Sequence, residues 1–418
     1  MTNFLGRASV LVLAALAMAA TPQVANAQRA SAPKKDEKPA PLKFSKKVQP
    51  ILAKVQKAQQ DEDQQGALAL LDEADALADK TPDDNYMISM MRLNSAIALK
   101  DNALLEKALE GALATGRIDA EEAVKFHRNL GALALQRNDF GKALAEFEQV
   151  LTADPSDAQL MVEVAELERR QGDDQKAITT LNKAIAAKAA SGEKADESWY
   201  RRALAIAFDK NLTAEIAASS EALLAAYPGA TNWRDVLVIY REGSKVDDQG
   251  NLDILRLMRA NNALTGERDY VEYAQTAILG GFPGEAKLVL DEGISKGALQ
   301  AATPAVKEML DNVNGRVKAD QASLAGLEKE AAGAKNGRAA MGTADAYLGY
   351  GEYAKAAALY KLALEKGDVD ADAANTRLGF ALAKSGDRAG ADSAFAAVKA
   401  APRTQLAKYY TLWADSQG

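Results

Sequence analysis

Cysteine is absent from the 418 residues, and the sequence contains a single histidine, His127. Without cysteine the chain has no disulfide framework and no residue to carry a lipid at a mature N-terminus. One histidine cannot supply a zinc site of the usual His/Cys composition. A Ser-His-Asp triad would have to use His127 itself. The sequence therefore offers little material for a metal centre or a hydrolytic triad.

Positive charge and aromatic residues are also scarce. Lysine and arginine total 51 against 58 acidic residues, and no long basic block occurs. Because nucleic-acid binding needs cationic side chains that neutralise phosphates, this balance predicts no nucleic-acid partner. Aromatic residues make up 6% of the chain and hydrophobic residues 48%, without long Val/Ile alternations. The composition favours helices packed closely through alanine around a sizeable core.

The N-terminal segment lacks an apolar run long enough to span a membrane. Residues 8–20 are apolar, but this run is shorter than the roughly 20 residues of a membrane-spanning helix. Arg7 precedes the run, and Pro22 separates it from "ANA", which ends at Ala27. These features are typical of a signal peptide over residues 1–27 that is cleaved after Ala27. They predict an exported bacterial protein, periplasmic or alternatively secreted, with no membrane span once the signal is removed.

Residues 28–43 differ in composition from the rest of the chain. The stretch "QRASAPKKDEKPAPL" combines three prolines with mixed charge and almost no bulky apolar side chains. Because such a segment buries too little apolar surface to offset its ordering entropy, we expect a flexible linker. From about Phe44 onward, helix-length apolar patterns alternate with short breaks such as "TPDD", "ADPSD" and "AYPGA". This succession predicts short connections between helices.

An internal period appears in the middle of the chain. Three apolar or small residues recur 34 positions later, since Ala177, Leu181 and Ala184 repeat Ala143, Phe147 and Val150. Such a period marks supersecondary units that cannot bury their apolar faces alone and therefore stack on their neighbours. The small residues let helices approach closely, and the aromatic ring fills the space between successive hairpins.

The same stretch resembles the tetratricopeptide repeat family. Its signature positions are occupied by His127, Leu130, Gly131, Ala143, Phe147 and Pro155. Two units near the C-terminus are similar, one with Tyr353, Ala356, Tyr360 and Ala363, the other with Leu378, Gly379, Ala391, Phe395 and Val398. The resemblance implies an all-α solenoid of helical hairpins whose inner face binds peptides or helices of other proteins.

A long helical pattern interrupts the repeats. Its apolar residues lie at heptad-like spacing, namely Leu310, Val313, Val317, Leu324 and Leu327. We therefore predict an all-α, tetratricopeptide-like helical-hairpin solenoid in two blocks: an array over 44–302, a connector helix over 303–335 and repeats over 336–418. The apolar stripe has two interpretations, packing against the two blocks or a short coiled-coil seam that gives weak self-association.

No catalytic, cofactor or metal site emerges from the motifs. The stretch "GRAAMGT" at 337–343 lacks the lysine of a phosphate loop, and no strand pattern precedes it. The stretch "VDDQGNLD" at 246–253 resembles a calcium loop, but Lys245 and Arg256 occupy the first and last ligand positions. We expect it to be a solvated turn that caps the next helix. Carboxylate pairs such as those in "DEAD" at 72–75 fit solvated helix faces.

What remains is the inner face of the predicted solenoid. Carried over by position, the family resemblance implies a partner-binding groove that includes Arg128, Gln136, Arg169, Arg170, Tyr200, Phe208 and Phe380. Ala132 and Glu166 stand where chaperone-binding members need asparagines, which argues against that role. The predicted function is a non-catalytic scaffold or adaptor of the cell envelope, with other proteins as partners. The alternative is an envelope enzyme that cleaves glycans with two facing carboxylates.

Overall fold

The computed structural model describes residues 41–417, and helices are the only regular secondary structure over that range. The all-α prediction is confirmed. The predicted signal peptide and most of the predicted linker lie outside the described residues. The chain divides into two compact units, unit 1 up to Glu193 and unit 2 from Lys194 onward. Between residues 41 and 417, no helix combines the length and the apolar character that a bilayer crossing requires.

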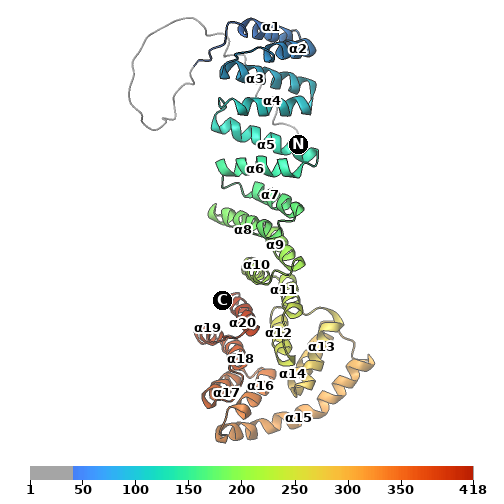
Figure 1. The fold of residues 1–418 in the computed structure, drawn as a ribbon. Helices are drawn as coiled ribbons and strands as arrows, with labels where there is room; N and C mark the ends of the chain where they lie inside the picture. The colour runs from blue at the N-terminus through green and yellow to red at the C-terminus, as the bar shows by residue number, and fades with distance from the viewer. Residues whose placement is uncertain (1–40, 418) are drawn as a thin grey trace, which may run out of the picture. The chain divides into compact units, whose positions relative to one another are not determined.

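Unit 1 is a series of four helical hairpins, α1/α2, α3/α4, α5/α6 and α7/α8, each packed on the next (Figure 1). Its helices are α1 (Gln49–Gln60), α2 (Gln64–Asp75), α3 (Pro82–Leu99), α4 (Asn102–Ala114), α5 (Ala120–Gln136), α6 (Phe140–Ala153), α7 (Ala158–Gln171) and α8 (Asp174–Ala190).

Each hairpin turn of unit 1 pairs one residue of left-handed backbone with an aspartate at the start of the next helix. The left-handed residues are Glu62, Lys100, Asn138 and Gly172. The residue that follows each of them is an aspartate. In the first three turns its carboxylate accepts a hydrogen bond from a backbone N–H in the first turn of the next helix. The left-handed residue reverses the chain, and the aspartate satisfies an amide that would otherwise lack a partner.

The repeat signature marks the places where two helices approach most closely. A Cβ atom added at Gly131 in α5 would lie 2.3 Å from Cε1 of Phe147 in α6. The same distance, 2.3 Å, separates a Cβ at Gly379 from Cε1 of Phe395 in the C-terminal part. Glycine is therefore required for the ring of the second helix to pack directly on the backbone of the first.

Unit 2 contains the remaining helices. They are α9 (Glu197–Asp209), α10 (Thr213–Ala226), α11 (Ala230–Gly243), α12 (Asp248–Ala260), α13 (Gly266–Leu279), α14 (Pro283–Ser295), α15 (Pro304–Gly333), α16 (Arg338–Gly349), α17 (Tyr353–Lys366), α18 (Ala371–Lys384), α19 (Arg388–Ala396) and α20 (Arg403–Asp415).

The end of unit 2 packs against its beginning. Helix α15 runs from α14 to α16, and α20 contacts not only α18 and α19 but also α10 and α12 (Figure 1). A single hydrophobic cluster, from Leu204 to Ala414, extends through these helices. The C-terminal repeats and the helices before α15 are therefore parts of one core.

The observed division of the chain differs from the predicted blocks, which met at the connector helix. The long helix itself is α15, but it lies inside unit 2, and the boundary between units falls at Glu193/Lys194. The physical reason is the packing of α20 on α10 and α12, which joins the predicted C-terminal block to the helices before the connector. Of the apolar stripe that has two interpretations, packing or a coiled-coil seam, Val313 and Leu324 are buried, and Leu310 and Leu327 pack against the unit 2 core. These side chains therefore pack inside unit 2.

The close approach at Gly131 predicts a specific sensitivity. In Gly131→Ala, the new methyl group overlaps the ring of Phe147, so we expect the free energy of unfolding to fall by about 1–3 kcal/mol. The measurement is the midpoint of urea unfolding followed by circular dichroism. Gly141→Ala is the matched control, because the nearest atom to its Cβ is Asp139 Oδ1 at 3.9 Å. It should be neutral or gain at most about 1 kcal/mol; equal losses in both variants would contradict the packing argument.

Candidate functional site

Four of the predicted groove residues lie on the first helices of two hairpins in unit 1. Arg128 in α5 donates to Asp157 Oδ2 at 2.6 Å, at the start of α7. At the other end of α7, Arg169 and Arg170 both contact the carboxylate of Glu166. The side chains of Arg128, Arg169 and Arg170 are 47%, 46% and 50% exposed. The structure therefore places three partly solvated guanidinium groups along α5 and α7.

Aromatic and amide groups accompany these arginines. The guanidinium of Arg170 lies 5.0 Å from the ring centroid of Phe140. Gln136, the last residue of α5, accepts a hydrogen bond from Asn102 at 3.0 Å. The surface of α5 and α7 thus combines cationic, aromatic and amide groups that are held by neighbouring helices.

The other three predicted residues belong to unit 2 and do not form one patch. On α9, Tyr200 packs edge-to-face on Tyr227 with ring centroids 5.7 Å apart, and Phe208 is 37% exposed. Phe380 of α18 is buried and contacts Tyr353, Tyr410 and Trp413. Phe380 also lines a pocket, described below.

The acidic stretch at 246–253 holds a residue that sequence reasoning placed wrongly. Asp247 caps α12 by accepting from the Gly250 N–H at 2.7 Å, as a capping turn should. Asp253, however, is only 1% exposed and lies at the centre of unit 2. The expectation of a solvated turn is wrong for this residue, because its charge partners are arginines that lie up to 150 residues away in sequence.

The carboxylate of Asp253 binds three arginines from three helices. Its Oδ1 accepts from Arg256 at 2.9 Å and from Arg377 at 2.8 Å, and its Oδ2 accepts from Arg403 at 2.8 Å. The hydroxyl group of Tyr410 donates to the Asp253 backbone carbonyl at 2.6 Å. Helices α12, α18 and α20 are thereby joined through one buried side chain. We refer to these contacts as the Asp253 network.

Two further carboxylates complete the charge balance of the network. Glu285 in α14 accepts from Arg256 at 2.8 and 2.7 Å. Asp345 in α16 accepts from Arg377 at 3.0 and 2.9 Å. Three buried guanidinium groups therefore meet three buried carboxylates, so none of these charges is left uncompensated. Tyrosine hydroxyls fill remaining acceptor positions, one of them from Tyr273 to Glu285 at 2.8 Å.

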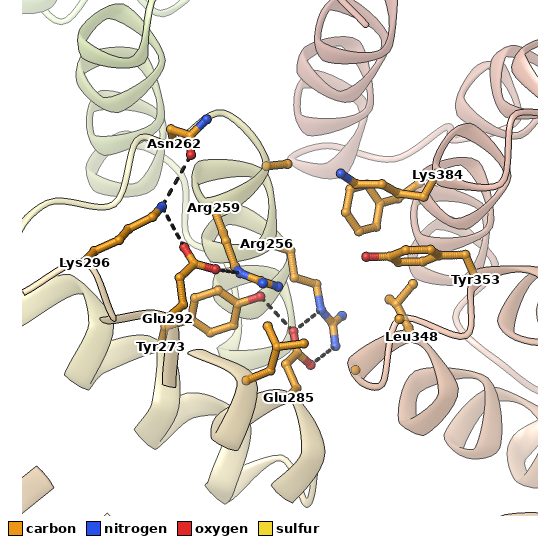
Figure 2. A pocket seen from close by; sticks show the side chains of 15 residues that line it. Arg256, Arg259, Asn262, Tyr273, Glu285, Glu292, Lys296, Leu348, Tyr353 and Lys384 are labelled. Atoms are coloured by element: carbon orange, nitrogen blue, oxygen red, sulfur yellow. Dashed lines mark hydrogen bonds and ion pairs between the residues drawn. The ribbon is translucent and has the colours of Figure 1, made fainter. Parts of the chain in front are cut away.

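A pocket of about 410 Å³ opens beside this network. Its walls come from α12, α13 and α14 on one side and from α16, α17 and α18 on the other (Figure 2). Its charged or hydroxylated lining residues are Arg256, Arg259, Tyr273, Glu285, Glu292, Lys296, Tyr353 and Lys384. Its apolar lining includes Leu288, Leu348 and Phe380. The volume and the mixture of apolar walls with a few convergent polar groups are typical of a ligand pocket.

The two carboxylates of the pocket are both engaged by cations. Glu285 is paired with Arg256, and Glu292 accepts from Arg259 at 2.6 Å and from Lys296 at 2.9 Å (Figure 2). Burial alone would raise the pKa of Glu292, but the hydrogen bonds from Lys296 and Arg259 outweigh it and lower that pKa. A glycan-cleaving enzyme needs one carboxylic acid whose pKa is raised so that it stays protonated. Glu292 has the opposite shift.

His127 and the glycine-rich stretch at 337–343 both make packing or hydrogen-bond contacts with neighbouring helices. His127 Nδ1 lies 2.7 Å from Glu146 Oε2, and its side chain is 25% exposed. Gly337 precedes α16, where a Cβ would lie 2.2 Å from the carbonyl oxygen of Ala363. Small size is therefore required there for packing. Within the described part of the chain, no group of three or more His, Asp or Glu side chains is arranged to hold a metal ion.

The fold defines a class of protein: stacked helical hairpins with glycine–aromatic contacts and short capped turns, that is, a helical repeat protein. Residues 94–158 and 128–193 match the model of the tetratricopeptide repeat family. Residues 94–193, within unit 1, therefore carry the tetratricopeptide repeat pattern, and the resemblance seen in that part of the sequence is confirmed. Repeats of this kind are in general protein-interaction scaffolds. No curated protein matches the sequence.

Several solved structures are similar to parts of the chain. A tetratricopeptide repeat protein from Parabacteroides merdae is 13% identical, with a TM-score of 0.24, over 70% of this chain and 98% of that one. PilF of Pseudomonas aeruginosa is 15% identical, with a TM-score of 0.19, over 66% of this chain and 90% of that one. The C-terminal part of a repeat protein from Cytophaga hutchinsonii is 12% identical, with a TM-score of 0.25, over 77% of this chain and 97% of that one. These low TM-scores place no constraint on what this chain binds.

The Asp253 network predicts that unit 2 depends on a single carboxylate. Asp253→Asn removes a buried charge and leaves the positive charge of the arginines in excess, so we expect the free energy of unfolding to fall by about 3–5 kcal/mol. The matched control is Asp291→Asn, which removes an exposed i,i+4 pair with Lys287 and should cost about 0–1 kcal/mol. Urea unfolding at neutral pH measures both.

The pH dependence of stability in the wild type and Asp253→Asn tests whether the charge of Asp253 is the cause of this loss. Burial raises the pKa of Asp253, but Arg377, Arg256 and Arg403 outweigh burial and lower it to about 2, from an ordinary value of 3.8. Because the folded pKa is the lower one, this stabilisation is complete above about pH 4 and is lost as the pH falls through about 2. The wild type should therefore lose on the order of 2 kcal/mol more than Asp253→Asn between these pH values. Parallel pH profiles would contradict the assignment.

Proposed function

We propose that the chain is a non-catalytic protein-interaction scaffold or adaptor of the bacterial cell envelope. Its repeats bind a peptide or helix of a partner protein in their concave groove. The tetratricopeptide repeats of residues 94–193 support the general role. The signal-peptide pattern of residues 1–27 supports export, with the periplasm as the destination.

The observation that carries the binding proposal is the arginine surface of α5 and α7. Arg128, Arg169 and Arg170 are each about half exposed, although each also contacts a carboxylate of its own unit. A guanidinium group has five N–H donors, so it can bind a second carboxylate while it keeps the first. The ring of Phe140 beneath Arg170 offers an apolar contact at the same place. This chemistry favours a partner segment with acidic and apolar residues.

The lack of catalysis is part of the proposal. Glu285 and Glu292, the carboxylates that line the unit 2 pocket, are each bound by cations. For Glu292, the hydrogen bonds from Lys296 and Arg259 lower the pKa, which makes this carboxylate unsuited to proton donation. The pocket therefore gives no support to the alternative of a glycan-cleaving enzyme.

Site-specific photo-crosslinking tests the groove. A photoreactive residue at Gln136, next to the arginine surface, should give a discrete crosslinked partner in intact cells. The double substitution Arg169→Glu/Arg170→Glu reverses two charges and should reduce this crosslink at least about tenfold, since each lost charged contact is worth about 1.5–3 kcal/mol. The same photoreactive residue at Lys183, exposed on the second helix α8, is the control. Identical products from both positions, or a crosslink insensitive to charge reversal, would contradict groove binding.

Export has a separate test. We expect to find the chain in the periplasmic fraction, with the mass of a polypeptide whose first residue is Gln28. Ala27→Asp places a charge at the cleavage site and should leave uncleaved precursor, because that position accepts only small residues. Ala30→Asp, beyond the site, should be processed normally. A full-length chain that retains residues 1–27 in the cytoplasmic fraction would contradict the proposed location.

A further inference from the structure

The unit 2 pocket holds a cation without a counter-charge. No carboxylate of the described residues pairs with the ammonium group of Lys384, which lies 5.8 Å from the ring centroid of Phe380 and 5.2 Å from that of Trp413. The Lys384 residue is exposed at the edge of the pocket. Partial burial of its ammonium group and the nearby charge of Arg259 both lower its pKa. Two cations therefore share the pocket; Arg259 is paired with Glu292, whereas no carboxylate of the described residues pairs with Lys384.

A hydroxyl donor accompanies these cations. Tyr353 projects from α17 toward α12, with its oxygen in the pocket, and its hydroxyl has no hydrogen-bond partner among residues 41–417 (Figure 2). Its ring packs edge-to-face on Phe380 with centroids 6.2 Å apart, which fixes the direction of the hydroxyl group. Figure 2 shows Lys384 and Tyr353 facing Arg259 and Arg256 across the pocket.

The charges around the pocket sum to an excess of positive charge. Arg256 is compensated by Glu285 and Asp253 within the Asp253 network. The other charged lining residues are three cations, Arg259, Lys296 and Lys384, and one carboxylate, Glu292. This excess is two positive charges, so a doubly charged anion would neutralise it and a singly charged anion would halve it. Since low-dielectric walls strengthen the attraction, the pocket favours an anionic ligand over a neutral one.

The size and the walls of the pocket indicate a small molecule. Six helices contribute to the lining, so the pocket surrounds its contents on several sides. About 410 Å³ accommodates a compact organic molecule and leaves little room for a continuous polypeptide. Leu288, Leu348 and Phe380 provide apolar contact for a body of aromatic or aliphatic character.

We propose that this pocket binds a small organic anion, a carboxylate or phosphate ester with an apolar or aromatic body. The anionic end lies between Lys384 and Arg259 and accepts a hydrogen bond from the Tyr353 hydroxyl. The body packs against Phe380 and Leu348. This site is independent of the arginine surface on α5 and α7, so it makes the chain a receptor for a small molecule as well as a scaffold.

Isothermal titration of the mature chain with phenyl phosphate tests the proposal. We expect saturable binding to one site, weaker binding of inorganic phosphate, and no binding of the neutral analogue benzyl alcohol. Lys384→Met should weaken binding of phenyl phosphate about tenfold or more, and Tyr353→Phe about fivefold, in line with the loss of a charged and a neutral hydrogen bond. Lys287→Met is the control, because Lys287 lies on α14 outside the pocket and pairs with Asp291. It should bind like the wild type.

The same titrations contain the results that would overturn the proposal. Absence of phenyl phosphate binding at tens of millimolar would do so. Equal weakening by Lys287→Met would show nonspecific attraction to surface charge. Binding of a blocked pentapeptide with one glutamate and one phenylalanine, but not of phenyl phosphate, would assign the pocket to a protein segment instead. Circular dichroism and thermal unfolding of each variant ensure that a loss of binding is not a loss of fold.

Discussion

The side chain of Asp253 is the contact on which the organisation of unit 2 depends. It joins α12 to α18 and α20 through arginines that are 124 and 150 residues away along the chain. A buried ion pair is costly to form, because each charge must leave water, and its net gain in stability is small when compared with apolar packing. In the observed arrangement of these helices, three guanidinium groups and three carboxylates are satisfied together, and a helix out of place would leave buried charges unpaired. The apolar cluster then fills the space that this arrangement defines.

The two units share the same local helix contacts but differ in which helices pack together. In unit 1, each hairpin turns at a left-handed residue that is followed by an aspartate, and each hairpin packs on the next, so that the contacts are mainly between helices close in sequence. Unit 2 repeats the glycine–aromatic contact at Gly379 and Phe395, but α15 separates its hairpins and α20 contacts α10 and α12. The first arrangement leaves the guanidinium groups of Arg128, Arg169 and Arg170 about half exposed on α5 and α7. The second encloses a pocket whose walls come from distant parts of the chain.

The local features were predictable because they depend on residues close in sequence. The all-helical fold, the helical hairpins with glycine–aromatic contacts at Gly131 and Gly379 and the long helix at 304–333 follow from spacing and composition. Phe380, predicted as a groove residue, is buried against Tyr410 and Trp413 and lines the pocket, and these contacts were not foreseen.

The features that sequence reasoning missed all depend on contacts between helices far apart in the sequence. Asp253 sits in an acidic stretch that resembles a solvated turn, and nothing near it reveals the arginines at 377 and 403. For the same reason the boundary at Glu193/Lys194 and the cations of the pocket were not predicted, since each depends on helices that meet only after folding. Local patterns specify helices and turns, whereas the pairing of distant helices is decided by buried polar groups and core shape.

The central claim is that the Asp253 network holds the end of unit 2 against its beginning. Hydrogen–deuterium exchange of the wild type and Asp253→Asn, resolved by peptide, tests it most directly. The account predicts faster exchange in α12, α18 and α20 of the variant, with the amides of unit 1 unchanged, because only unit 2 loses its charge partner. The account would be contradicted if exchange in α18 and α20 were unchanged in the variant, or if exchange rose equally in both units.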